Sequence, residues 1–351
     1  MAERSTVVIT GASAGVGRAT ARAFARRGWN IALVARGSEG LEATRAEVEQ
    51  DGGAALALAA DVADADAVFR AADRAVEAFG GVDVWINGAM ATVYGEVGEI
   101  TPEEFRRVTE VTYLGYVHGT MAALRHMRPR NSGTIVQIGS ALAYRAIPLQ
   151  AAYCGAKFAI RGFTDALRSE LIHAGSGVRI TMVQLPGVNT PQFDWARNHM
   201  DGRPRPVGSV FAPEAVAEHV VRAAAKAPRE LWVGGPAVQA ILGDMVVPGL
   251  LDRMLAGKAY SGQQTDEPAR ERPDNLFEPL PGDRGAQGRF RDEARGSVGA
   301  YDPAHLRGAA ALAGLGLLGV AWLLGRTTAA GHRRRAGLPW GARRSSWIRV
   351  R

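Results

Sequence analysis

Residues 138–157 read IGSALAYRAIPLQAAYCGAK, and the rest of the chain is organised around this stretch. Ser140 precedes Tyr153 by thirteen positions, and Lys157 follows Tyr153 by four. The apolar run before Ser140 predicts a buried strand, and the sequence around Tyr153 predicts a helix. Side chains four positions apart share one face of a helix, so we expect the Lys157 ammonium beside the Tyr153 phenol.

Such a pair can make a tyrosine exchange protons near neutral pH. A free tyrosine ionises near pH ~10, so this requires roughly 3 pKa units, or about 4 kcal/mol, which an adjacent cation in a poorly solvated cleft can supply. Ser140 would then hydrogen-bond the substrate oxygen that Tyr153 protonates. The alternative is a strand serine, a packed tyrosine and a solvated lysine, and the Tyr-x-x-x-Lys spacing alone fits both.

A glycine-rich turn near the N-terminus is the second motif. Residues 10–17 read TGASAGVG, with Gly11, Gly15 and Gly17 following an apolar run. Glycine lets the backbone turn tightly and approach a pyrophosphate at the N-terminus of the next helix. Together with Ser140, Tyr153 and Lys157 downstream, this turn gives the chain a pattern that resembles the short-chain dehydrogenase/reductase family, over about residues 6–236.

The order of the expected elements predicts a doubly wound parallel α/β sheet of the Rossmann type. Apolar runs predict strands at residues 6–10, 30–35, 54–60, 82–86, 133–139, 178–184 and 230–233. Helices are expected at residues 15–27, 38–50, 65–79, 101–128, from 151 onward and at 212–227.

The end of the second expected strand bears on the choice of cofactor. In NAD-preferring relatives an acidic residue there accepts hydrogen bonds from the ribose, whereas this chain has Ala35 followed by Arg36. A guanidinium can pair with a 2′-phosphate, so NADP is expected in preference to NAD. The alternative is that Arg36 is only a solvated surface residue.

The resemblance implies further cofactor contacts. They are Ser13 in the glycine turn, Asp61 and Val62 at the adenine, Asn87 after the fourth strand, Thr190 at the nicotinamide carboxamide, and Tyr153 and Lys157 themselves. Asp61 also suits a helix N-cap, and both roles can hold at once. Two residues near Asn87 depart from the family pattern, since relatives usually read Asn-Asn-Ala-Gly where this chain has Gly88 and Met90.

The catalytic roles also follow from the resemblance. Tyr153 is the acid in the reduction direction, Lys157 lowers its pKa and binds the ribose, and Ser140 holds the substrate oxygen. Relatives place a catalytic asparagine where this chain has Thr112. A threonine can still hold a water, so Thr112 is predicted as a weaker fourth member of the site.

Charge and composition exclude other classes of site. The net charge is +7, but residues 326–351 hold eight arginines and no acid, so the first 325 residues carry −1. The body therefore has no general signal for nucleic-acid binding. The single cysteine, Cys154, excludes an internal disulfide and is expected to pack rather than react. The seven histidines show no metal-ligand spacing, so no metal is predicted.

The C-terminal third is expected to hold extensions. The catalytic domain should cover residues 1–258, with an apolar-faced segment at 238–255 broken by Pro248. A polar linker without regular structure should follow at residues 259–307. Residues 308–325 carry no charge and would span about 27 Å as a helix, which is close to a bilayer's roughly 30 Å core. With the basic tail at residues 326–351, this helix predicts membrane contact, by spanning or by lying in the interface, and packing on protein is the alternative.

The function expected from these observations is hydride transfer between NADP and a small carbonyl or alcohol. Phe193, Trp195 and Met200 lie in the expected substrate lid and favour an apolar substrate portion. The absence of a leader sequence predicts a cytoplasmic, membrane-associated enzyme, and the resemblance implies a homo-oligomer. A catalytically weak nucleotide-binding scaffold or sensor at a membrane is the alternative, since Gly88, Met90 and Thr112 depart from the family.

Overall fold

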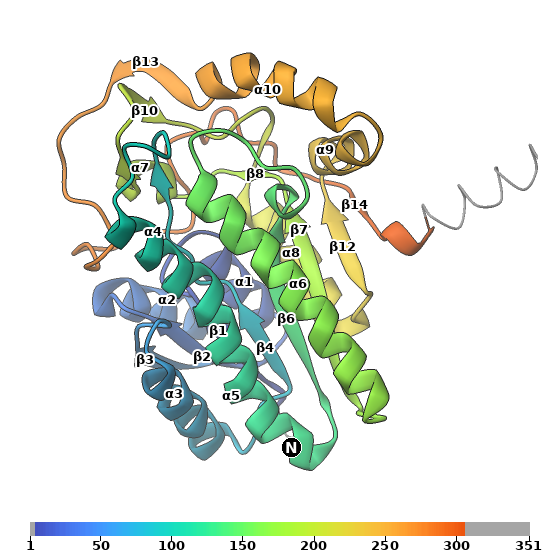
Figure 1. Cartoon of the computed structure of the whole chain (residues 1–351). Helices are drawn as coiled ribbons and strands as arrows, with labels where there is room; N and C mark the ends of the chain where they lie inside the picture. Colours follow the sequence, from blue (N-terminus) through green and yellow to red (C-terminus); the bar gives the residue numbers. More distant parts are fainter. Residues whose placement is uncertain (1–3, 306–351) are drawn as a thin grey trace, which may run out of the picture. The chain divides into compact units, whose positions relative to one another are not determined.

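The computed structural model describes residues 4–305. The chain separates into one unit at residues 1–303 and another at residues 304–351. Eight strands of the first unit form a sheet in the order β14-β12-β7-β6-β4-β1-β2-β3 (Figure 1). They are β1 (Thr6–Thr10), β2 (Asn30–Ala35), β3 (Ala54–Ala59), β4 (Val84–Asn87), β6 (Gly133–Ser140), β7 (Val178–Leu185), β12 (Glu230–Val233) and β14 (Ala300–Tyr301). All pairs are parallel except β12 with β14.

Helices cover both faces of this sheet, which is why its strands are apolar runs without alternation. All five residues of β1, for example, are buried. One hydrophobic cluster joins the sheet to α1 (Gly15–Ala25), α2 (Ser38–Gln50) and α8 (Pro213–Lys226). The other joins it to α3 (Ala65–Phe79), α4 (Pro102–Thr109), α5 (Gly115–Arg130) and α6 (Ala151–His173). The predicted doubly wound sheet is confirmed.

The reversal of strand order beside β1 produces a crevice that can bind a ligand. The chain winds from β1 through β2 to β3 on one side and through β4, β6, β7 and β12 on the other. The strand order therefore reverses between β1 and β4, and a crevice opens at the carboxyl ends of the strands at such a switch point.

The helix expected at residues 101–128 is interrupted. Thr101 and Glu104 form a reciprocal cap at the start of α4, as a Thr-Pro-Glu-Glu start favours. A π-helix, η1 (Glu110–Leu114), then separates α4 from α5. A π-turn holds one more residue than an α-turn, so it changes which side chains of the following helix face the sheet.

Residues 259–307 differ from the predicted polar linker. Over the described residues, β13 (Gln264–Pro268) pairs with β10 (Gly202–Pro204), and β14 extends the central sheet. Leu276 and Gln263 are fully buried. Composition did not indicate this structure, because the segment is held by backbone hydrogen bonds and a few buried side chains. It has no periodic apolar face.

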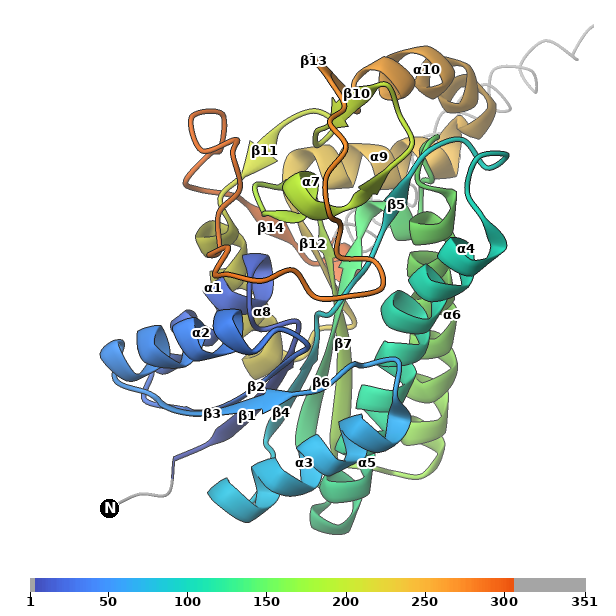
Figure 2. The same cartoon turned by 90° about the vertical axis from the view of Figure 1, so that its left-hand side faces the viewer.

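We call residues 269–299 the C-terminal strap. Figure 2 shows it in orange, crossing the region above the carboxyl ends of the strands. The apolar segment before it forms two helices, α9 (Gly235–Val246) and α10 (Pro248–Ser261), and Pro248 is the first residue of α10 as its missing N–H favours.

Within residues 4–305, no helix is both long enough and apolar enough to cross a membrane. The apolar helix predicted at residues 308–325 and the basic tail at residues 326–351 lie outside the described residues.

Candidate active site

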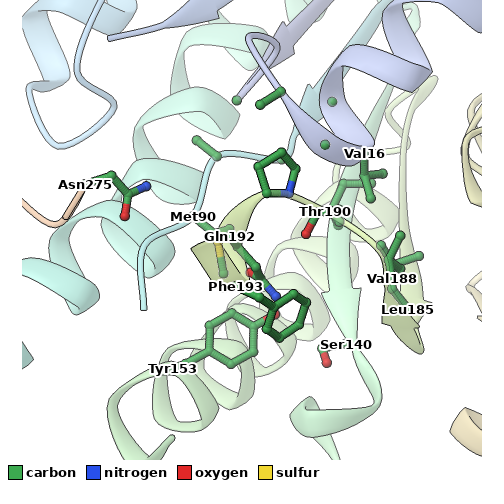
Figure 3. Close-up of a pocket in the computed structure, with 18 of the residues that line it drawn as sticks. Val16, Met90, Ser140, Tyr153, Leu185, Val188, Thr190, Gln192, Phe193 and Asn275 are labelled. Carbon is green, nitrogen blue, oxygen red and sulfur yellow. The ribbon is translucent and has the colours of Figure 1, made fainter. Parts of the chain in front are cut away.

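Ser140, Tyr153 and Lys157 meet at the carboxyl edge of the sheet, where β6 ends and α6 begins. Ser140 Oγ accepts a hydrogen bond from Leu142 N at 3.1 Å, and Ser140 is also hydrogen-bonded to the Tyr153 hydroxyl. Lys157 Nζ lies 5.5 Å from the centroid of the Tyr153 ring. The structure thus brings the three predicted catalytic residues together, and Figure 3 shows Ser140 and Tyr153 at one cavity.

Lys157 is buried, with 2% of its surface exposed. Its Nζ donates to Ile138 O at 2.7 Å and to Tyr116 Oη at 3.0 Å. No carboxylate among residues 4–305 forms an ion pair with it. Burial without a counter-charge disfavours the ammonium and lowers the pKa of Lys157 to about 7.

Burial also opposes the predicted activation of Tyr153. It raises the pKa of the Tyr153 hydroxyl well above its ordinary value of 10.0, although the hydrogen bond with Ser140 acts in the opposite direction. The expected shift toward neutrality is therefore not found within the described protein residues. A poorly solvated cleft penalises the phenolate as well as the ammonium, and burial is the largest effect on the pKa of each group.

Tyr116 belongs to the site although no sequence motif identified it. Its hydroxyl donates to Ile138 O at 3.0 Å while accepting from Lys157. The ring lies under the same ammonium, with Lys157 Nζ 4.7 Å from its centroid. Tyr116 is the second residue of α5, just after η1, and no sequence pattern predicted that π-turn.

Thr112, the predicted fourth catalytic residue, does not line the cavity. Its Oγ1 accepts from Ala91 N at 3.0 Å and donates to Ala91 O at 2.8 Å, and the side chain is fully buried. Both hydrogen-bonding directions of the hydroxyl are therefore used by the loop after β4. This geometry favours a structural role for Thr112 over the predicted proton relay.

The glycine turn is packed too tightly for larger residues. Gly11 and Gly15 have φ angles of +73° and +56°, in the left-handed region that favours glycine. A Cβ on Gly17 would lie 2.1 Å from Gly11 O, and one on Gly15 would lie 3.1 Å from the Thr190 side chain. These close approaches fit a cradle that brings the backbone against a pyrophosphate.

One cavity of about 690 Å³ joins this turn to the catalytic residues. Its walls include Ser13, Arg36 and Val62 at one end and Ser140 and Tyr153 at the other. The volume lies within the roughly 300–1,000 Å³ of small-molecule sites. The residues present therefore fit a dinucleotide whose nicotinamide end reaches Tyr153.

Asp61 and Arg36 lie at the adenosine end of the cavity. Asp61 accepts from Ala63 N at 3.0 Å and forms an ion pair with Arg107. The N-cap of α3 is Asp64, so Asp61 does not have the capping role that its sequence position also suits. The guanidinium of Arg36 donates to backbone carbonyls of the C-terminal strap, including Phe277 O at 2.6 Å.

Asn87 does not line the cavity, in contrast to its predicted cofactor contact. Its side chain accepts from Trp85 Nε1 at 2.8 Å and donates to Gln137 Oε1 at 2.9 Å. It therefore ties β4 to β6. The unusual Gly88 beside it has a packing reason, because a Cβ there would lie 2.9 Å from Thr10 O.

Apolar side chains surround the catalytic end of the cavity. Tyr94, Leu142, Ile147, Phe193 and Val207 all line it. Phe193 (Figure 3) comes from α7 (Gln192–Trp195), in the predicted lid. It packs on Tyr94 with ring centroids 6.4 Å apart. This wall suits an apolar substrate portion.

A reactive thiol and a metal centre are two other kinds of chemistry that a site can hold. Cys154 is buried, and burial raises the pKa of its thiol to about 11, which favours the predicted packing role over a reactive thiolate. Among residues 4–305, no group of three or more His, Cys, Asp or Glu side chains could hold a metal ion.

Comparisons with known proteins agree with this geometry. Residues 5–201 match the short chain dehydrogenase family. An uncharacterized oxidoreductase of Bacillus subtilis, YxnA, is 32% identical over 273 residues, covering 77% of this chain and 77% of its own length. A 3beta-hydroxysteroid dehydrogenase of Eggerthella lenta is 34% identical, covering 60% of this chain and 83% of its own. The solved structure of an alcohol dehydrogenase from Thermococcus sibiricus, complexed with 5-hydroxy-NADP, matches with 30% identity and a TM-score of 0.57, covering 66% of this chain and 96% of that one.

Proposed function

The chain belongs to the short-chain dehydrogenase/reductase family, and on that premise we propose that it transfers hydride between NADP and a carbonyl or alcohol with an apolar portion. It is an oxidoreductase of that family, acting on CH–OH or C=O groups. The observation that carries the proposal is that one cavity holds the glycine turn at one end and Ser140, Tyr153 and Lys157 at the other.

The choice of NADP and the apolar substrate are supported by separate observations. Arg36 at the adenosine end supports NADP, because a guanidinium can pair with a 2′-phosphate. The archaeal alcohol dehydrogenase of similar fold was solved with an NADP derivative. The apolar wall around Phe193 supports an apolar substrate, and the similarity to a hydroxysteroid dehydrogenase points the same way.

The chemistry divides between the cofactor and the side chains. When bound, reduced NADP supplies the hydride for the carbonyl carbon. The Tyr153 hydroxyl donates the proton to the carbonyl oxygen, and its own negative charge is stabilised by the Ser140 hydrogen bond and the Lys157 ammonium. Tyr116 and Ile138 O hold that ammonium in place. In the oxidation direction the Tyr153 phenolate removes the alcohol proton.

A substrate screen tests this function. Purified full-length protein would be mixed with NADPH and with aldehydes, ketones, quinones and sterols in turn, and the loss of absorbance by the reduced cofactor would be followed. We expect turnover with apolar carbonyls, and with NADPH in preference to NADH. Binding of NADP without turnover of any of these classes would instead support a nucleotide-binding scaffold.

Membrane contact through residues 308–351 is a separate proposal, motivated by the uncharged run and the eight arginines. Fractionation of the full-length protein beside a version ending at Leu306 tests it. Retention of only the longer form by membranes is the expected result. Release of that form by salt or carbonate would indicate an interfacial position, and equal recovery of both forms without detergent would exclude an anchor.

Assembly into a homo-oligomer is the other proposed partnership. Large apolar side chains are exposed on α4, α5 and α6 and on η1 between them, namely Phe105, Leu114, Met121, Phe158 and Ile172. The molar mass in solution, compared with 37.2 kDa for one chain, tests this.

A further inference from the structure

We propose that the C-terminal strap forms part of the cofactor-specificity site, and that its carbonyl oxygens orient Arg36 so that the free edge of the guanidinium receives the 2′-phosphate of NADP. This inference rests on the proposed function and deepens it. It assigns a role in cofactor choice to residues 275–277, which lie far beyond the family match at residues 5–201.

The hydrogen bonds of Arg36 leave a defined edge open. Nη1 donates to Phe277 O at 2.6 Å and lies 3.5 Å from Leu276 O, and Nη2 donates to Asn275 O. An arginine has five N–H donors in a rigid plane. The Nε–H and one Nη2–H have no acceptor among residues 4–305. Nε and Nη2 lie on one side of the guanidinium, the side that can pair with two phosphate oxygens as a fork.

A second arginine, Arg107, offsets the negative charge next to Arg36. Arg107 donates to Leu276 O at 3.1 Å and forms an ion pair with Asp61. Among the acids near Arg36, Asp61 has the largest electrostatic effect on the Arg36 pKa, which it raises. Because Arg107 neutralises this carboxylate, a 2′-phosphate beside Arg36 meets less repulsion than Asp61 alone would impose.

Buried anchors fix the strap where it touches Arg36. Leu276 is 0% exposed and belongs to the hydrophobic cluster on the α3–α6 face of the sheet. Its N–H donates to Asp274 Oδ1 at 2.9 Å, and Asn275 N donates to Trp195 O at 3.0 Å. The three carbonyls are thus positioned by packing, and an arginine held in this way loses less conformational entropy when it binds phosphate.

The other half of the strap follows the cofactor cleft. Gly285 O accepts from Gly15 N at 3.2 Å, and Asp283 forms an ion pair with the buried Arg18 of α1. Arg284 and Pro281 line the same cavity as the glycine turn. The strap therefore borders the cleft from the glycine turn to Arg36, which is the placement that a cofactor-binding element requires.

Loosening the strap without touching Arg36 provides the test. Leu276→Ala removes the buried anchor, and calorimetric titration would give dissociation constants for NADP, NAD, adenosine 2′,5′-bisphosphate and 5′-AMP. We expect NADP and the bisphosphate to bind about three- to tenfold more weakly, because one charge-assisted contact becomes misaligned. NAD and 5′-AMP should change by less than about twofold. Leu171→Ala is the matched control, because Leu171 is buried in the same cluster on α6 and should leave all four constants unchanged.

A double mutant shows whether the strap acts through Arg36. Arg36→Ala alone should weaken NADP about 10- to 100-fold, and adding Leu276→Ala should then weaken it no further. Asp274→Ala, which removes the acceptor for Leu276 N at a partly exposed position, should reproduce the NADP-specific loss if Leu276→Ala fails to fold.

The remaining outcomes would overturn the proposal. An equal loss for NADP and NAD in Leu276→Ala would make the strap a general cover for the cleft. Tighter NADP binding in Leu276→Ala would mean that the strap carbonyls compete with the 2′-phosphate for Arg36. A parent protein that binds NAD and NADP alike would refute the strap's role while leaving hydride transfer intact, whereas a parent that binds neither would refute the proposed function as well.

Discussion

The ammonium nitrogen of Lys157 lies 3.0 Å from the hydroxyl oxygen of Tyr116, which in turn donates to Ile138 O. Tyr116 therefore supplies one of only two oxygen acceptors for this buried cation among residues 4–305. Since an acceptor favours the charged form of a lysine, Tyr116 helps to keep Lys157 protonated beside Tyr153. It is a positioning residue, because it acts on the reacting groups through Lys157.

Tyr116→Phe should shift the pH dependence of catalysis. Without the hydroxyl the pKa of Lys157 falls below its value of about 7, so less positive charge faces Tyr153 and the Tyr153 pKa rises. The basic form of Tyr153 is needed for alcohol oxidation, so the rise of kcat/KM with pH should move to higher pH. A loss of about tenfold is expected at pH 7.

Tyr113→Phe is the control for that shift, because Tyr113 packs against the same small cluster as Tyr116. A pH–rate profile of both variants makes the comparison. If Tyr116→Phe lowered kcat/KM by one factor at every pH, its role would be structural only.

Tyr153→Phe should remove the proton donor and leave cofactor binding nearly intact. General acid catalysis is typically worth about 10²- to 10⁴-fold, and a loss of kcat in that range is expected. Steady-state rates on a substrate found in the screen measure it, with NADP affinity as the check on folding. Turnover at the parent rate would refute the assignment of the catalytic residues.

The sequence predicted the sheet well because a parallel sheet has unusually plain sequence features. Strands covered on both faces are continuous apolar runs, as in the fully buried β1. The glycine turn and the Tyr153–Lys157 pair were also predictable, since each depends on local spacing alone. Local geometry on one helix or one turn does not require knowledge of distant residues.

The parts that sequence could not predict depend on contacts between distant residues. The C-terminal strap meets Arg36 across about 240 residues, as the pairing of Arg36 with Leu276 shows, and its polar composition gives no periodic signal. Tyr116 follows a π-turn, for which no residue pattern was available. Asn87 illustrates a third limit, because the direction of its side chain is decided by Trp85 and Gln137, which no motif indicates.

Asn87→Ala should therefore act on stability rather than on cofactor affinity. It leaves the buried Trp85 Nε1 and Gln137 Oε1 without their partner, at a cost of about 1–3 kcal/mol in the free energy of unfolding. Denaturant unfolding and NADP titration measure the two effects separately. A loss of NADP affinity of tenfold or more, with stability unchanged, would restore the predicted direct contact.

Lys157→Met should make the protein more stable at mildly acid pH while abolishing its activity. The folded-state pKa of Lys157, about 7, lies below its ordinary value of 10.5. Between these two values the unfolded chain binds more protons than the folded one, so the lysine's contribution to stability improves as pH rises. Below pH 7 both states are protonated, and the penalty for burying the ammonium is constant and largest. Replacing it with an apolar side chain of similar length should therefore add about 1–4 kcal/mol at pH 6, and the gain should shrink toward pH 10.

Denaturant unfolding of the parent and variant at pH 6 and pH 9.5 measures this gain. Lys226→Met is the control, because Lys226 is exposed in the last turn of α8 and should show no such pH dependence. Activity must be lost in Lys157→Met, because no ammonium then faces Tyr153. A variant less stable than the parent at pH 6, or a gain that grows with pH, would show that Tyr116 and Ile138 O compensate the buried charge fully, and that catalysis here carries no cost in stability.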